Sequence, residues 1–265
     1  MQIAKQLRER TDPLLIVRAD EMFTEMIKFE NVSFEYEKGS PVIRDMSFEI
    51  ADGEAVGLIG ANGAGKSTIM KLLLGLVMAG EGRVLVDGME VSNANLGQIR
   101  KKLGFVLQNS DNQMFMPTVY EDMMFGPLNY GMSREDAEKV VDEVLERLGL
   151  QYLKHKYNHR ISGGEKRMAA IATILAMKPE AVLMDEPTSA LDPCNRRIVI
   201  NTIRDMDQTR IITSHDLDMI LDTCDRVILI SDGRIAADGK AADILSDRTL
   251  LEANRMELPL SMSRR

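Results

Sequence analysis

The amino-acid sequence predicts an α/β fold, in which a mostly parallel β-sheet is covered by helices. Short apolar runs that are typical of buried strands recur in the second half of the chain, at 181–184, 210–213 and 227–230. Helix-like stretches separate them, and this alternation indicates a parallel sheet with helices on both faces. A glycine-rich loop at 60–67 joins a predicted strand to a predicted helix. The length of 265 residues allows one such domain with an inserted subdomain.

The composition narrows the function classes before any motif is considered. Hydrophobic residues make up 45% and charged residues 28% of the chain, which is ordinary for a soluble globular protein. The formal net charge of -8 argues against a standing interaction with nucleic acid, because phosphate binding needs an excess of Lys and Arg. Cys194 and Cys224 form no paired framework, so we interpret both as reduced cytosolic thiols. No apolar run reaches the ~18 residues of a membrane span and no signal peptide is recognisable, so we expect a cytoplasmic protein.

The first third of the chain carries strand and turn patterns. We interpret residues 1–25, which are mixed in charge and weakly patterned, as an N-terminal extension; a short amphipathic helix is the alternative. Apolar residues nearly alternate from 27 to 36 and again from 46 to 50, which predicts two half-buried strands. A short buried strand is predicted at 55–59, and Asp87-Gly88 predicts a hairpin turn.

The middle of the chain, from about 111 to 165, lacks buried-strand signals and is predicted to be a mostly helical insertion. Ser133 with Asp136 three residues later is a helix-start signature. Apolar residues follow at steps of three and one, and Gly149 is placed to end the helix. Residues 240–256 predict two short helices near the C-terminus.

The glycine-rich loop carries the strongest chemical signal. Its residues are Gly60, Ala61, Asn62, Gly63, Ala64, Gly65, Lys66 and Ser67. They match the phosphate-binding pattern GxxxxGK[ST], in which backbone N–H groups surround an anion and the following helix adds the positive end of its dipole. Lys66 is expected to reach the β- and γ-phosphates, and the Ser67 hydroxyl to ligate Mg²⁺. The loop therefore predicts a site for ATP and Mg²⁺.

A buried strand that ends in two carboxylates, Asp185 and Glu186, is the expected partner of this loop. In a parallel sheet, the end of this strand is expected to lie beside the phosphate loop. Asp185 is predicted to hold the Mg²⁺ shell, and Glu186 to orient and polarise the attacking water.

A second helix start with exposed glycine N–H groups is predicted at Ser162, Gly163 and Gly164, before a helical run from Lys166 to Met177. One phosphate loop already accommodates one triphosphate. We therefore interpret this segment as contacting the nucleotide of another subunit. The alternative is an ordinary serine N-cap followed by flexible glycines.

Together these motifs resemble those of the ATP-binding cassette (ABC) ATPases. They stand in that family's order, from about residue 26 to 240: the phosphate loop, Gln108, Ile161-Ser162-Gly163-Gly164-Glu165, Asp185-Glu186, Ser189-Ala190-Leu191-Asp192 and His215. The family usually has Leu at 161 and Gln at 165. The resemblance implies a P-loop NTPase fold, with a parallel-sheet core, an antiparallel β subdomain and an inserted helical subdomain. It places the ATPase domain at 26–240 and a C-terminal helical tail at 241–265.

The resemblance also implies roles for single residues. Tyr36 resembles the aromatic residue that stacks on adenine, although a strand tyrosine can also be plain core, and Thr68 joins the nucleotide site. Gln108 resembles the glutamine that touches Mg²⁺ and water. His215 resembles the residue that contacts the γ-phosphate, and Asp192 the acid that crosses the dimer interface.

The stretch from Gln108 to Asn129 resembles the energy-coupling-factor (ECF) and cobalt-importer branch of the family. It contains a QNSDNQ segment, where the branch typically has QNPDNQ, and an FGPLN segment. Such importers combine two ATPase subunits, equal or different, with a membrane-embedded coupling protein and a substrate-capturing membrane protein. The resemblance implies ATP hydrolysis at the cytoplasmic face of the membrane that powers uptake of a vitamin or a transition-metal ion such as cobalt or nickel.

Two other functions stay open, as does the role of an apolar stretch. The stretch suits either a groove for a helix of the membrane partner or the core of the helical insertion: Met114, Phe115, Met116, Met123, Met124 and Phe125. The chain could instead be a non-transport ABC ATPase of DNA repair or translation, or a mainly nucleotide-binding subunit of a heterodimer. The first usually carries two cassettes or basic arms, and the intact Glu186 argues against the second.

Overall fold

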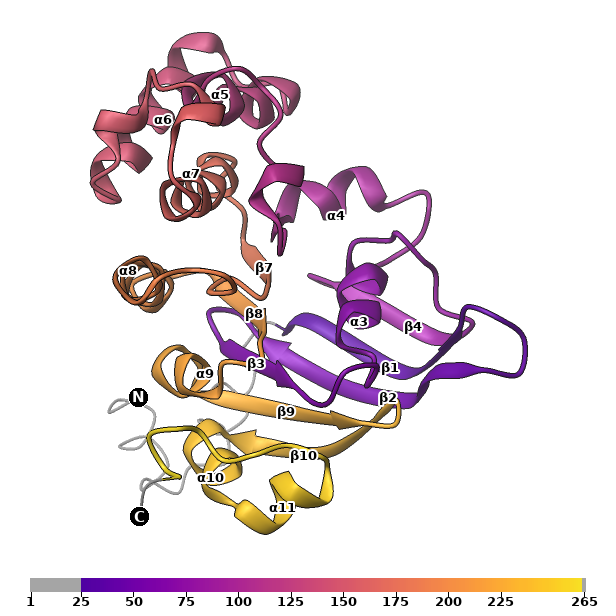
Figure 1. The fold of residues 1–265 in the computed structure, drawn as a ribbon. Coiled ribbons are helices and arrows are strands. Elements are labelled where there is room, and N and C mark those ends of the chain that lie inside the picture. Colours follow the sequence, from indigo (N-terminus) through magenta and orange to yellow (C-terminus); the bar gives the residue numbers. More distant parts are fainter. Residues whose placement is uncertain (1–24, 264–265) are drawn as a thin grey trace, which may run out of the picture.

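A six-stranded sheet is the centre of the described part of the chain, residues 25–263 of a computed structural model (Figure 1). Its strands lie in the order β10-β9-β3-β8-β7-β6, and all neighbours pair in parallel except β10, which is antiparallel to β9. The bounds are β3 Ala55–Ile59, β6 Leu103–Val106, β7 Ala181–Asp185, β8 Thr209–Thr213, β9 Arg226–Ser231 and β10 Arg234–Lys240. The predicted parallel sheet is confirmed. The expected N-terminal extension lies, apart from Glu25, outside the described residues.

A second, antiparallel sheet has the strand order β2-β1-β4-β5. Its strands are β1 Glu25–Glu35, β2 Pro41–Ala51, β4 Glu81–Val86 and β5 Met89–Glu90, with Asp87-Gly88 at the predicted hairpin turn. Phe29 and Phe48 stack across β1 and β2 with their ring centroids 4.5 Å apart. Helix α3, Lys66–Leu73, packs between the two sheets, and its apolar residues share one core with both of them.

The two faces of the parallel sheet contribute to two different cores. In β7, Ala181 and Leu183 belong to the core around α3, whereas Val182 and Met184 belong to the core under the other helices. This division follows from the alternation of side chains along a strand. Because both faces are covered, the strand is apolar from Ala181 to Met184, as its sequence pattern predicts. The second core includes α7 Gly163–Ala176, α8 Pro193–Arg204, α9 Leu217–Thr223, α10 Ala241–Ser246 and α11 Arg248–Ala253, and helices between β6 and α7 also contribute to it.

Between β6 and α7, the named elements are all helical, and α5 and α6 lie at one end of the structure (Figure 1). These elements are η1 Ser110–Asn112, α5 Val119–Asn129, α6 Arg134–Arg147, η2 Gln151–Leu153 and η3 Asn158–Arg160. The helix predicted after Ser133 is confirmed, since the Ser133 side chain accepts a hydrogen bond from the Asp136 N–H and Gly149 has a positive φ of 67°. Helix α4, Leu96–Lys102, precedes β6.

A buried carboxylate ties two parts of this helical segment together. Asp122 on α5 accepts hydrogen bonds from the N–H groups of Phe115 and Met116, both at 3.1 Å, and from the Asn158 side-chain amide. Burial raises the pKa of Asp122 from its ordinary value, and these hydrogen bonds act in the opposite direction. The loop before α5 is therefore fastened to the start of η3, and Tyr157, just before η3, forms a β-bridge with Thr118.

The apolar stretch at 114–125 is divided between the core of the helical segment and its surface. Met114, Met123 and Met124 are buried in the core under the helices. Phe115 and Phe125, by contrast, are 63% and 43% exposed, and their rings meet edge to face at 4.9 Å. Methionines fill the inside of the helical segment, while two phenylalanines form an apolar spot on its surface.

The C-terminal segment after α11 returns to α9. The two helices predicted near the C-terminus are α10 and α11, and the chain then runs back to α9, where the N–H groups of Leu260 and Ser261 donate to the Asp218 carboxylate. Cys224 is buried and Cys194 exposed, and both are free thiols. Within residues 25–263, every helix is too short or too polar to span a bilayer.

Candidate functional site

The phosphate loop leaves β3 in the middle of the parallel sheet and enters α3 directly. The N-cap of α3 is Gly65, whose φ of 114° lies in the left-handed region, and a Cβ there would come within 2.7 Å of Ile43. No side chain caps this helix, and its first turn contains no acidic residue. The first N–H groups of α3 are therefore available to an external anion, which the helix dipole also favours.

Lys66 is buried beneath the loop. Its Nζ donates hydrogen bonds to the carbonyl oxygens of Gly60 at 2.6 Å and Ala61 at 3.1 Å. Burial lowers the pKa of Lys66, whereas the nearby carboxylates of Glu186 and Asp185 raise it. An ammonium group thus lies between the phosphate loop and the two acids that end β7.

One open cavity of about 500 Å³ collects most of the predicted site residues. It is lined by Tyr36, Val42, Asn62, Gly63, Ala64, Gly65, Lys66, Ser67, Thr68, Lys71, Gln108, Asp185, Glu186 and His215. The structure therefore brings together the adenine, phosphate, metal and water candidates. Gly60 and Ala61, the first two residues of the loop, line a neighbouring hollow instead.

Lys71 is a cavity residue that the sequence analysis missed. It lies one helical turn after Ser67, so the spacing of four could have indicated that both face the same side. Its Nζ donates to the Tyr36 hydroxyl at 3.3 Å and lies 5.3 Å from the centre of the Tyr36 ring. Tyr36 itself is half exposed, with its ring at the cavity rather than in the core.

The two acids at the end of β7 are held by the neighbouring strand. Asp185 accepts a hydrogen bond from the Thr213 hydroxyl at 2.6 Å. Glu186 has a positive φ of 49°, and its carboxylate accepts from the Ser214 hydroxyl at 3.0 Å and the His215 N–H at 2.9 Å. The His215 ring nitrogen Nε2 lies 3.7 Å from Glu186 and its side chain is half exposed. A carboxylate fixed in this way can orient and polarise a water molecule in the cavity.

Oxygen atoms prevail among the groups that could hold a cation here. The Ser67 hydroxyl, the Asp185 carboxylate and the Gln108 side chain supply the oxygen donors that Mg²⁺ prefers, and substrate phosphates and water complete such a shell in other proteins. Within residues 25–263, no group of three or more His, Cys, Asp or Glu side chains forms a site that could hold a metal without such help. The residues present therefore fit a Mg²⁺ ion that arrives with a nucleotide.

The Ser162 segment, residues 162–164, lies outside this cavity. Helix α7 begins at Gly163, earlier than the predicted run from Lys166, because Ser162 and Glu165 form a capping box. The Ser162 Oγ accepts from the Glu165 N–H at 3.2 Å, and the Glu165 carboxylate accepts from the Ser162 N–H at 2.8 Å. The serine N-cap that the sequence left as an alternative is therefore present.

The two glycines of the Ser162 segment meet different surroundings. A Cβ on Gly164 would come within 2.1 Å of the Asn195 side chain, so this position is closed by packing within the chain. A Cβ on Gly163 would meet nothing within 4 Å. Asn195 in turn donates to Asp192, the N-cap of α8, so the Asp192 loop and the Ser162 segment are in contact.

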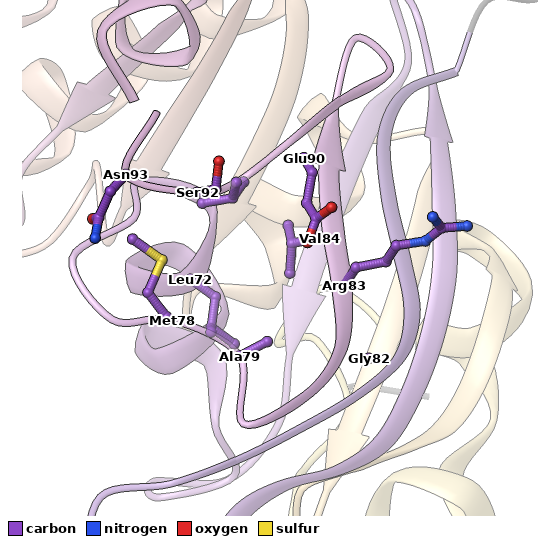
Figure 2. A pocket seen from close by; sticks show the side chains of 10 residues that line it. Leu72, Met78, Ala79, Gly82, Arg83, Val84, Glu90, Ser92 and Asn93 are labelled. Carbon is purple, nitrogen blue, oxygen red and sulfur yellow. The ribbon is translucent and has the colours of Figure 1, made fainter. Parts of the chain in front are cut away.

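A second hollow, of about 280 Å³, contains none of the predicted site residues (Figure 2). It lies between the end of α3 and the strands β4 and β5, where Leu72, Met78 and Val84 contribute apolar side chains. Figure 2 shows the Arg83 guanidinium pointing away from the hollow, and it pairs with Glu30 instead. Glu90 is the other charged residue that lines this hollow.

Residues 43–189 match the family model described as "ABC transporter". A putative ABC transporter ATP-binding protein of Geobacter sulfurreducens is 45% identical over 86% of this chain and 91% of its own length. The energy-coupling factor transporter ATP-binding protein EcfA of Methanothermobacter thermautotrophicus is 39% identical over 88% of this chain and 77% of its own length. Among solved structures, cbiO1 of Clostridium perfringens, described as part of the ABC transporter complex cbiONQ, superposes with a TM-score of 0.79 at 30% identity, covering 87% of this chain and 94% of its own.

The capping box generates a prediction about pH. The hydrogen bond from the Ser162 N–H is the main reason why the pKa of Glu165 lies below its ordinary value of 4.5. A lowered pKa means that the ionised group stabilises the fold above about pH 4.5 and that this contribution is lost as the pH falls through the folded-state pKa. Glu165→Gln keeps an acceptor for the cap without the charge. We expect the variant to be less stable than the parent near neutral pH and the difference to vanish on acidification.

The measurement is the free energy of unfolding of both proteins from urea titrations at a series of pH values. Glu165→Ala, which removes the acceptor, serves as the control and should cost about 1 kcal/mol at neutral pH. A difference between the parent and Glu165→Gln that stays constant with pH would contradict the role of the charge.

Proposed function

The chain belongs to the ABC transporter family as an ATP-binding, ATP-hydrolysing subunit, and we propose that it drives an importer of the energy-coupling-factor type. One observation carries the catalytic part of the proposal. A single cavity joins the phosphate loop to the acids after β7, to Gln108 and to His215, whereas the Ser162 segment of the same chain lies outside it. Each site therefore has its own phosphate loop and needs a second chain to complete it.

The nucleotide is proposed to lie along the cavity. The triphosphate binds the N–H groups of the loop and the start of α3, with Lys66 beside its β- and γ-phosphates. The adenine stacks on the half-exposed ring of Tyr36, with Lys71 at the edge of that ring and Thr68 within reach of its hydroxyl. Ser67, Asp185 and Gln108 would hold Mg²⁺, which would neutralise charge on the phosphates.

Hydrolysis is assigned to the end of β7 and its neighbours. Glu186 orients and polarises the attacking water, in a position that Ser214 and the His215 N–H hold from the other side. The His215 side chain is half exposed at the cavity and contacts the γ-phosphate. Positioning by these groups, together with charge stabilisation, accounts for the catalysis of phosphoryl transfer to water.

The second chain is proposed to supply its Ser162 segment to this site. The helix start at Gly163 presents N–H groups and the Ser162 hydroxyl outward, which suits the phosphates of a nucleotide bound elsewhere. The open space at Gly163 supports this reading, because nothing within the chain fills the place of a side chain there. The Asp192 loop, next to Asn195, lies on the same edge and is proposed to cross the dimer interface.

The membrane partner is proposed to bind the apolar spot of Phe115 and Phe125. Exposed aromatic rings on a helical surface suit the apolar face of an incoming helix. The relatives EcfA and cbiO1 support an ECF-type assembly with a coupling protein and a substrate-capturing protein in the membrane, and with the ATPase bound peripherally at its cytoplasmic face. The cargo is proposed to be a vitamin or a cobalt or nickel ion.

Glu186→Gln tests the catalytic assignment. We expect the variant to bind ATP as the parent does, because the phosphate loop is unchanged, and to lose hydrolysis by at least ~10²-fold, the range for a positioned base. Phosphate release and nucleotide binding are measured in the assembled complex. Near-normal turnover would remove Glu186 from the proposed role.

A pairing of two substitutions tests the contact between subunits. Dimers are assembled from two differently tagged chains that carry Ser162→Arg and Lys66→Ala either on the same chain or on opposite chains. If Ser162 serves the partner's nucleotide, opposite-chain placement concentrates both defects in one site and leaves the other intact. Same-chain placement damages both sites.

The readout is ATP hydrolysis of the two mixed dimers at equal concentration. We expect the opposite-chain dimer to retain activity and the same-chain dimer to lose it. The reverse ranking would mean that Ser162 acts on the nucleotide of its own chain.

Phe115→Glu combined with Phe125→Glu tests the membrane contact. A charge at each ring opposes burial against an apolar helix, so we expect the tagged double variant to lose co-purification with the membrane coupling protein from mildly solubilised membranes while it still binds ATP. Leu76→Glu, a similar change at a residue that is 61% exposed on the other half of the molecule, is the matched control. Unchanged co-purification of the double variant would rule out this surface as the binding site for the membrane coupling protein. Co-purification of the parent with DNA-repair or translation proteins, in place of a membrane protein, would favour the non-transport alternative.

A further inference from the structure

A buried arginine joins α7 to the segment that carries Gln108. Arg167 is only 4% exposed, and its guanidinium donates hydrogen bonds to the carbonyl oxygens of Leu107, at 2.6 Å, and of Gln108. Among residues 25–263 it has no ion-pair partner, its Nε is buried without a hydrogen bond, and burial lowers its pKa. A buried cation that is satisfied by two backbone carbonyls is tied to the position of that backbone.

The two carbonyls constrain the shape of the Gln108 segment. Along an extended strand, successive carbonyls point to opposite sides, so one side chain cannot reach both. Here β6 ends at Val106, and the turn that follows brings the carbonyls of Leu107 and Gln108 to the same planar guanidinium. The planar guanidinium of Arg167 therefore fits one conformation of this turn, because its N–H donors have fixed directions.

A second link joins the same peptide to α7. The Leu107 N–H donates to the Gln113 side-chain oxygen at 3.0 Å, and the Gln113 amide donates to the Ala170 carbonyl at 2.7 Å. Leu107 is thus attached to α7 through both its N–H and its carbonyl. Arg167 lies five residues after Ser162 in the chain, a rise of about 7.5 Å along α7. Because both belong to one helix, a movement of the Ser162 segment moves Arg167 with it.

We propose that Arg167 is a positioning residue for ATP hydrolysis, which makes the place of Gln108 in one site depend on the orientation of α7. The inference rests on the proposed function, in which Gln108 contacts Mg²⁺ and water and the start of α7 contacts the partner's nucleotide. When Ser162 engages that nucleotide, α7 is fixed in one orientation, and Arg167 carries this orientation to the carbonyl of Gln108. Occupancy of one site thereby sets the geometry of the other.

The test compares two buried arginines. Arg167→Met keeps an apolar side chain of similar length and removes the hydrogen-bond donors. Arg167→Lys keeps the positive charge and one ammonium group that can donate to a carbonyl. Arg210→Met is the matched control: Arg210 is 8% exposed, also donates to backbone carbonyls, of Met206 and Gln208, and does not line the nucleotide cavity. The assay is ATP hydrolysis by the full dimer, with kcat and KM determined separately and the free energy of unfolding measured in parallel.

We expect Arg167→Met to lower kcat by about tenfold or more, the range of a coupling between sites, while KM for ATP is unchanged because the phosphate loop is intact. Arg167→Lys should restore part of kcat, and Arg210→Met should lose stability without losing kcat. If Arg167→Met does not fold, the Lys variant carries the test through its kcat relative to the parent. An Arg167 variant that folds and keeps the parent's kcat would overturn the inference.

The Glu186→Gln background separates this inference from the proposed function. If Glu186→Gln alone forms an ATP-dependent dimer, seen by size-exclusion chromatography, the proposed function stands, and adding Arg167→Met should weaken that dimer. A dimer that is equally stable with Arg167→Met would contradict the inference alone. If Glu186→Gln forms no ATP-dependent dimer, the proposed function fails first.

Discussion

The parallel hydrogen bonding of the central sheet is the constraint on which the site depends. Parallel strands place all their carboxyl ends at one edge of the sheet. In the order β3-β8-β7-β6, the four strands that are followed by site residues are direct neighbours. The loops that follow them carry the phosphate loop, His215, Glu186 and Gln108 in that spatial order. Asn62 and His215, 153 positions apart in sequence, therefore line one cavity, and a slip of any strand would separate the site residues.

Buried polar groups, satisfied by backbone, hold this arrangement in place. Lys66 donates to the carbonyls of its own loop, Arg167 to those around Gln108, and Asp122 accepts from the N–H groups before α5. Each carries a charge that is costly to bury and is compensated by hydrogen bonds to peptides. Such contacts fix the position of a loop more narrowly than apolar packing does, because donors and acceptors have preferred directions.

The sequence predicted most of the fold and most of the residues that line the cavity, and what it did not predict has physical causes. The phosphate loop and the acids after β7 were found because their chemistry demands particular residues at particular spacings. Lys71 was missed, since a lysine on a helix has no pattern of its own and acts here only through the neighbouring ring of Tyr36. The methionines and phenylalanines at 114–125 could not be assigned, because hydrophobicity does not tell a buried face from an exposed one.

By itself the sequence indicated the alternation of strands and helices, the loop with the phosphate-binding pattern and the two acids after β7, because periodicity and spacing are local properties of the chain. The tertiary structure alone decided which of these residues share a cavity and which do not. It placed the Ser162 segment outside the nucleotide cavity of its own chain and placed the Arg167 guanidinium on the carbonyls of the Gln108 segment. Both results depend on how α7 packs against the end of β6, and packing between distant segments leaves no periodic trace in a single sequence.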